Sequence, residues 1–116
     1  MALTIGLINA SLPSYFPKKH GVFDAARAML DELAVREGLT IVEAPDIPID
    51  GADARRAVDA CLAQGADFIL LLHGGFTMGD VAREIARYNI PMGVWSTPEP
   101  ALTGDVQLNN FVSLNM

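Results

Sequence analysis

The hydrophobic positions of this chain alternate between short continuous runs and longer stretches with a period near that of a helix. The continuous runs predict strands at Leu3–Ile8, Thr40–Glu43, Phe68–Leu72 and Ile90–Trp95. The periodic stretches predict helices at Val22–Glu37, Gly51–Gln64 and Met78–Tyr88. This strand–helix alternation predicts a parallel sheet with helices on both of its faces.

Local signals support the helix boundaries. Gly38 and Gly65 follow the first two predicted helices, where glycine commonly takes a left-handed backbone conformation. Asp50 is expected to cap the second helix. Thr77 and Asp80 have the spacing of a capping pair and indicate where the third helix begins.

The apolar positions also predict which faces are buried. The first helix should bury Phe23, Ala26, Leu30, Leu33 and Ala34, and expose Asp24, Arg27, Asp31 and Glu32. The second helix should bury Ala54, Ala57, Val58, Cys61 and Leu62. Every position from Phe68 to Leu72 is apolar, as in a central parallel strand covered on both sides.

These elements predict one flavodoxin-like (Rossmann-like) domain over residues 1–116, a three-layer α/β/α fold. Its sheet should be mainly parallel, with four or five strands. The chain has 116 residues, of which 51% are hydrophobic, so it can form a substantial core. Doubly wound sheets usually have five or six strands, so we expect this one to be incomplete.

Charge and cysteine content narrow the class of protein. The net charge is −6, and no basic surface of the kind that binds nucleic acid is evident. No apolar run reaches the roughly 18 residues of a membrane span, and the N-terminus lacks the basic residues of a secretory signal. The single cysteine, Cys61, excludes a disulfide framework and should be inert core. We expect a cytoplasmic protein with no membrane or nucleic-acid partner.

Candidate chemistry lies after the strands, because ligands of open α/β sheets bind beyond the carboxyl ends. Three segments follow strands at this edge: Asn9–Phe16, His73–Thr77 and Trp95–Glu99. All three are polar or aromatic. Polar groups beside aromatic rings suit a hydroxylated ligand such as a sugar.

Several of these residues have more than one interpretation. Gly74–Gly75 could cradle an anion at a helix start or form a plain turn, and no nucleotide-binding glycine motif occurs. His73 could be structural or functional, and Trp95 could stack on a sugar or close the core. Ser11, His73 and Asp80 are the residue types of a catalytic triad, but no characteristic spacing supports one, so we discount it. No motif with metal-ligand spacing is present.

Four segments carry a resemblance to a known family: Gly6–Pro13, His73–Thr77, Gly93–Pro100 and Leu108–Asn115. In order and spacing, they resemble the N-terminal domain of the L-fucose/L-arabinose isomerase family. The resemblance covers essentially the whole chain. It implies a cytoplasmic, Mn²⁺-dependent aldose–ketose isomerase that works through an enediol and assembles as a homo-oligomer. In this family the flavodoxin-like N-terminal domain packs against the active site of a neighbouring subunit and helps to close the sugar pocket.

The resemblance also implies roles for individual residues. Asn9, Ser11 and His73 would form hydrogen bonds to sugar hydroxyls, with Phe76 and Trp95 as apolar walls. The other residues expected at or near the sugar are Tyr15, Gly74, Gly75, Thr77, Glu99, Gln107, Asn109 and Asn110.

The family's metal ligands and proton-transfer groups come from domains that follow this one and are absent from this sequence. We therefore predict no catalytic residue, metal ligand or cofactor in this chain, with Mn²⁺ bound only by the full-length enzyme. The chain by itself should be inactive. Its expected partners are the sugar substrate, neighbouring subunits and the missing C-terminal domains.

A second hypothesis is a stand-alone flavodoxin-like module that binds a sugar or a phosphate without chemistry. A receiver domain is disfavoured, because this chain has Asn9 and His73 where acidic residues would be needed. A flavin domain is also disfavoured, because its phosphate loop would be reduced to Ser11 and Ser14.

Overall fold

The computed structural model of the chain describes residues 3–11, 21–74, 77 and 79–96. In chain order these residues form β1 (Thr4–Ala10), α1 (Val22–Glu37), β2 (Thr40–Glu43), α2 (Gly51–Ala63), β3 (Phe68–His73), α3 (Gly79–Ala86) and β4 (Met92–Ser96). The predicted alternation of strands and helices is confirmed. Among the described residues, none of the helices combines the length and apolar composition needed to cross a lipid bilayer.

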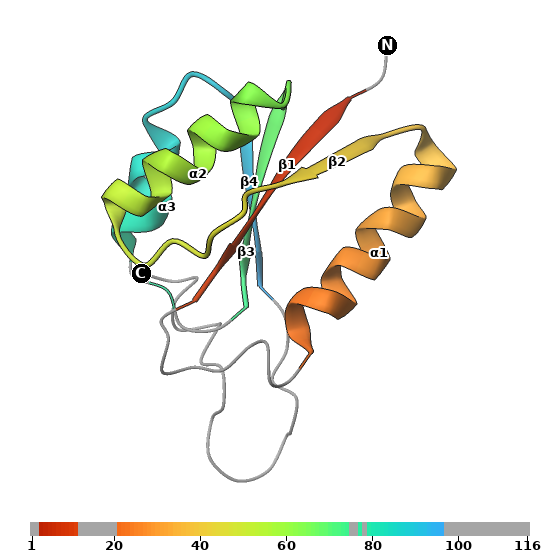
Figure 1. The fold of residues 1–116 in the computed structure, drawn as a ribbon, viewed down its shortest axis with the longest axis horizontal. Helices are drawn as coiled ribbons and strands as arrows, with labels where there is room; N and C mark the ends of the chain where they lie inside the picture. The colour runs from red at the N-terminus through yellow and green to blue at the C-terminus, as the bar shows by residue number, and fades with distance from the viewer. Residues whose placement is uncertain (1–2, 12–20, 75–76, 78, 97–116) are drawn as a thin grey trace, which may run out of the picture.

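The four strands make one parallel sheet in the order β2-β1-β3-β4. Helix α1 lies on one face of this sheet, and α2 and α3 lie on the other (Figure 1). The predicted three-layer, flavodoxin-like fold is therefore confirmed. The chain moves outward from β1 to β2 and then returns to β3 on the other side of β1. The strand order thus reverses between β1 and β3, the place where such folds bind ligands.

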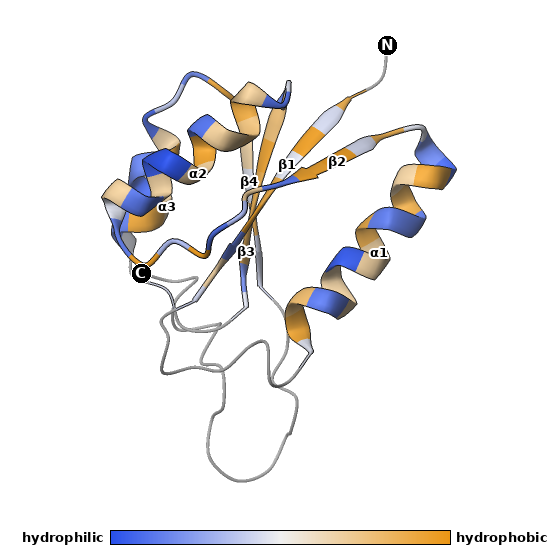
Figure 2. Cartoon of the chain, in the orientation of Figure 1, coloured by the Kyte–Doolittle hydropathy of each residue, from blue (hydrophilic) through white to orange (hydrophobic). Residues whose placement is uncertain are grey.

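Each face of the sheet has its own hydrophobic core. On the side of α2 and α3, the larger buried residues are Ile8, Val58, Cys61, Ile69, Leu71, Val81 and Ile85. On the side of α1, the buried residues are Leu7, Phe23, Ala26, Leu30 and Leu72. Strand β3 supplies residues to both cores and is apolar along most of its length (Figure 2). This is the central, doubly covered strand that the sequence predicts.

The helix signals behave largely as predicted. Asp50 caps α2, since its Oδ1 accepts a hydrogen bond from the Asp53 amide at 2.8 Å. Gly38 ends α1 with a left-handed backbone, φ 70°. Leu62, however, is 39% exposed, so its predicted place in the core is wrong. The buried stripe of α2 follows a narrow line of small side chains, and Leu62 lies one step outside it.

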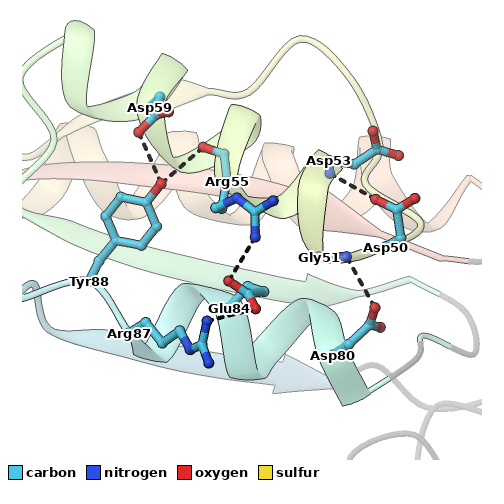
Figure 3. Close-up of polar contacts among 9 residues, drawn as sticks. All are labelled: Asp50, Gly51, Asp53, Arg55, Asp59, Asp80, Glu84, Arg87 and Tyr88. Carbon is cyan, nitrogen blue, oxygen red and sulfur yellow. Dashed lines mark hydrogen bonds and ion pairs between the residues drawn. The ribbon is translucent and has the colours of Figure 1, made fainter.

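Polar contacts bind α2 to α3 (Figure 3). Arg55 Nη1 pairs with Glu84 Oε2 at 3.1 Å, and the Tyr88 hydroxyl donates to Asp59 Oδ1 at 3.0 Å. Asp80 Oδ2 accepts from the Gly51 amide at 3.1 Å. The carboxylate of Asp80, in the first turn of α3, thus reaches the start of α2. Its predicted capping pair with Thr77 stays a prediction.

Three strands extend further toward the carboxyl edge than the apolar runs suggest. Strand β1 continues through Asn9 to Ala10, β3 continues to His73, and β4 continues to Ser96. The reason is that the parallel ladder persists past the apolar run, pairing Ala10 with His73 and His73 with Ser96. Asn9 and His73 are therefore held in rigid strands rather than in the loops that follow them.

Buried Cys61 packs against a glycine in β1. A Cβ atom at Gly6 would lie 2.7 Å from the Cys61 Cβ, so β1 and α2 approach closely only because residue 6 is glycine. Cys61 is fully buried, and this burial raises its pKa from 9.0 to about 11. The thiol is therefore protonated at neutral pH, and its predicted place in an inert core is confirmed.

Candidate functional site

The carboxyl edge of the sheet presents two rows of side chains on opposite faces. Asn9, Leu72 and Trp95 are register partners and form a row on the α1 side, where Leu72 belongs to the core. His73 and Ser96 form the next row, which faces α2 and α3. Adjacent residues of a strand point to opposite faces. The predicted site residues Asn9 and His73 therefore share an edge but do not share a face.

Asn9 takes part in a hydrogen-bonded series that crosses three elements. Its Nδ2 donates to Glu43 Oε2, at the end of β2, with a distance of 3.2 Å. The other carboxylate oxygen of Glu43 accepts from Arg27 Nη1 at 2.8 Å. Arg27 also pairs with Asp31 through its Nε at 2.8 Å. The bonds to Asp31 and Glu43 raise the pKa of Arg27, which therefore stays charged.

These contacts fix the orientation of the Asn9 amide. A carboxylate can only accept hydrogen bonds, so the amide nitrogen must face Glu43. The Asn9 Oδ1 then lies on the other side, buried and with no hydrogen-bond partner among the described residues. Asn9 as a whole is only 7% exposed. A buried acceptor without a donor costs on the order of 1–3 kcal/mol, which a ligand hydroxyl could recover.

A pocket of about 240 Å³ lies beside Asn9, between the start of α1 and the segment after β2. It is lined by Asn9, Gly21, Phe23, Asp24, Glu43, Ala44, Pro45 and Ile47. The polar side chains contribute two carboxylates and an amide, and the remaining walls are largely apolar. This combination suits a small ligand that carries both hydroxyl groups and C–H surface.

His73 occupies a different environment from Asn9. It is 4% exposed, and burial lowers its pKa, so the imidazole is neutral near pH 7. It is not one of the residues that line the pocket beside Asn9. Ser11 and Thr77 are also buried near this edge of the sheet. The structure thus brings Asn9 together with residues that the sequence did not single out, rather than with His73.

Gly74 is explained by packing against α1. Its amide donates to the Ala10 carbonyl oxygen at 3.0 Å, which extends the pairing of β1 with β3. A Cβ atom at residue 74 would overlap the Phe23 ring and would lie 2.7 Å from Phe23 Cζ. Because its amide is already used, this glycine is better suited to packing than to cradling an anion.

Trp95 packs, half-buried, against the α1-side core. The structure therefore accounts for this residue as core closure, and stacking on a sugar stays a prediction. The remaining predicted site residues lie outside the described residues: Tyr15, Gly75, Phe76, Glu99, Gln107, Asn109 and Asn110.

A second pocket, of about 290 Å³, lies between the segment 45–48 and α2. Its charged lining residues Asp53 and Arg56 already pair with each other, and Arg56 is exposed. Nothing buried and unpartnered lines it within the described part of the chain. The pocket beside Asn9 is the stronger candidate, although it is the smaller of the two.

Sequence inspection missed the two residues that organise this pocket, Glu43 and Arg27. Glu43 ends β2 at the same carboxyl edge as Asn9, so applying the strand-end rule to every strand would have found it. Arg27 looked like part of the solvated face of α1. Its contact with Glu43 depends on how α1 lies across β2, which the helical period does not reveal.

Comparisons of the chain with protein-family models, curated proteins and solved structures gave no match. Evidence on function therefore comes from the chemistry of the pocket and from the sequence motifs. The described residues offer no group of three or more His, Cys, Asp and Glu side chains that could hold a metal.

Proposed function

We propose that this chain binds a neutral, hydroxyl-rich small molecule, a sugar, in the pocket beside Asn9. The observation that carries the proposal is the buried Oδ1 of Asn9, which has no partner among the described residues. A sugar hydroxyl can donate a hydrogen bond to such an acceptor. The apolar parts of Phe23, Pro45 and Ile47 can contact the C–H surface of a sugar ring.

The charge of the pocket favours a sugar over a phosphate. Asp24 and Glu43 both line the pocket, and their carboxylates repel an anion such as phosphate. Arg27 does not line the pocket, and its positive charge is already paired with Glu43 and Asp31. The phosphate-binding version of the stand-alone module is therefore disfavoured by the lining of this pocket.

Within this proposal, the wider role is that of a substrate-pocket and oligomerisation domain of a cytoplasmic, Mn²⁺-dependent aldose–ketose isomerase. The support for this role is the resemblance of the loop sequences, including His73–Thr77 and Gly93–Pro100. The metal and proton-transfer groups would come from other domains. In that assembly Ser11, which follows β1, and His73, at the end of β3, would contact the sugar at the active site of a neighbouring subunit.

Sugar binding is tested by calorimetric titration of the purified chain with L-fucose and L-arabinose. A single small pocket and a ligand of this size predict a Kd on the order of millimolar. Asn9→Ala should weaken binding about tenfold, because it removes the buried acceptor. The matched control is Asn89→Ala, an exposed residue between α3 and β4 at the opposite edge of the sheet, which should bind like the parent chain.

Equal binding by both asparagine variants and the parent chain would contradict the proposed pocket. The isomerase role has a separate test, in which a longer protein containing this chain is assayed with Mn²⁺. Aldose–ketose isomerisation by that protein, and none by the 116-residue chain, is the expected result. Isomerisation by the 116-residue chain alone would contradict the role of a domain without catalytic residues.

A further inference from the structure

The series of contacts from α1 to β1 fixes which end of the Asn9 side chain faces Glu43 and which end faces away from it. We propose that Arg27 is a positioning residue. By holding Glu43, it orients the Asn9 amide so that the Asn9 Oδ1 accepts a hydrogen bond from a ligand in the pocket. The pocket would then select ligands by the direction of a hydrogen bond, preferring a hydroxyl that can donate. This inference rests on the sugar-binding function proposed above.

The contacts link three elements in turn, α1, β2 and β1. Arg27, in α1, has one nitrogen 2.8 Å from Asp31 and another 2.8 Å from Glu43, so both ends of its guanidinium are held. Glu43, in β2, has one oxygen bonded to Arg27 and the other to Asn9 in β1. Both oxygens of Glu43 are therefore engaged within this series.

Two of the three groups in this series, Arg27 and Glu43, can form hydrogen bonds in only one direction. A guanidinium can only donate hydrogen bonds and a carboxylate can only accept them, whereas an amide can do either, depending on which end it presents. The polarity of Asn9 is thus set by its neighbours. With Glu43 held in place, the nitrogen faces Glu43 and the Oδ1 faces away from it. A ligand ether at this point would offer no proton to the buried oxygen, and a ligand hydroxyl would.

Holding Glu43 in place requires Arg27, because Glu43 is not confined by burial. The side chain of Glu43 is 37% exposed, and that of Arg27 is 36% exposed. Ion pairs this accessible to water add little to stability, so removing one should leave the fold intact. Without Arg27, the Glu43 carboxylate is free to turn to solvent, and the Asn9 amide can then take either orientation.

Two substitutions break the series at different points. Arg27→Met keeps the apolar stem but removes the charge and all donors, and Glu43→Gln replaces the obligate acceptor with an amide of either polarity. Arg27→Lys is the rescue variant, because an ammonium group can still donate to Glu43. Arg36→Met is the matched control, since Arg36 lies on the same helix, is 68% exposed and pairs only with Glu37 in the described part of the chain.

The first readout is the pair of side-chain NH₂ signals of Asn9 in NMR spectra of the isotope-labelled chain. Their exchange with solvent should be slow in the parent chain, in Arg36→Met and in Arg27→Lys, and fast in Arg27→Met and Glu43→Gln. The second readout is affinity for L-fucose and for each of its mono-O-methyl ethers. The parent chain should prefer L-fucose about tenfold over the ether that blocks the hydroxyl meeting Asn9, and the two disrupting variants should lose this preference.

Unchanged Asn9 signals in Arg27→Met would overturn the proposal, and so would a change in Glu43→Gln alone. An equal shift in Arg36→Met would also overturn it, because the effect would then be one of general charge. If the parent chain binds none of these sugars, the proposed function fails. The Asn9 signals then decide by themselves whether Arg27 positions the amide.

Discussion

Replacing Gly74 with alanine would place a methyl group in space that the Phe23 ring occupies. The new Cβ would overlap Phe23 Cε1 and lie 2.7 Å from Cζ and 2.9 Å from Cδ1. Carbon atoms in contact normally stay about 3.5–4.0 Å apart, so the ring must move by roughly 1 Å or more. Phe23 is only 7% exposed and belongs to the α1-side core, so this movement disturbs the packing of the first turn of α1.

The expected cost follows from overpacking and from partial loss of apolar burial. Overpacking a core costs about 1–3 kcal/mol, and exposing part of an aromatic side chain adds to it. We expect Gly74→Ala to lower the free energy of unfolding by about 2–3 kcal/mol, measured by urea denaturation. Because Phe23 also lines the pocket, sugar affinity should fall in the same variant.

A double-mutant cycle separates this contact from a general effect of the added methyl group. Phe23→Leu makes room for the methyl group, so the double variant should be more stable than the sum of the two single changes predicts, by about 1 kcal/mol or more. Gly93→Ala is the control, since its Cβ would approach Phe68 only to 3.2 Å and should cost less than about 1 kcal/mol. Additive single changes, or a Gly74→Ala variant as stable as the parent chain, would refute the packing explanation.

Three further predictions concern stability and titration. The free energy of unfolding should fall as the pH rises from 9.0 toward about 11, because the Cys61 thiol ionises first in the unfolded chain, and Cys61→Ala should weaken this dependence in urea titrations. Stability should also fall as the pH drops below 6.5, because burial lowers the pKa of His73 and the unfolded chain takes up the proton first; thermal unfolding of His73→Gln should show a smaller pH dependence. Asp50→Ala should destabilise the chain by about 1 kcal/mol in urea denaturation, because it removes the cap on the Asp53 amide.

The order and type of the helices and strands could be predicted from the sequence, because each has a clear hydrophobic pattern and a recognisable end. Asp50 and Gly38 mark helix ends by local chemistry, which does not depend on the rest of the fold. The extent of the strands was harder to predict. Asn9 and His73 are polar and looked like loop residues, yet pairing with neighbouring strands keeps both in the sheet.

The composition of the site was less predictable than the fold. The strand-end rule correctly brought Asn9 and His73 to one edge, but their opposite faces depend on the register between β1 and β3. Gly74 resembled part of an anion-binding turn, and its requirement for glycine comes instead from the ring of Phe23, about fifty residues earlier in the chain. Contacts of this kind arise from the tertiary arrangement and leave no signal in local sequence.

The central claim is that a sugar binds where Asn9, the start of α1 and the end of β2 meet. The most direct measurement is a titration of the isotope-labelled chain with L-fucose, followed by two-dimensional amide NMR. The account predicts that the shifting signals cluster at Asn9, Gly21–Asp24 and Glu43–Ile47, with a Kd on the order of millimolar. Shifts confined to α2 and α3, or no shifts at saturating sugar, would contradict it.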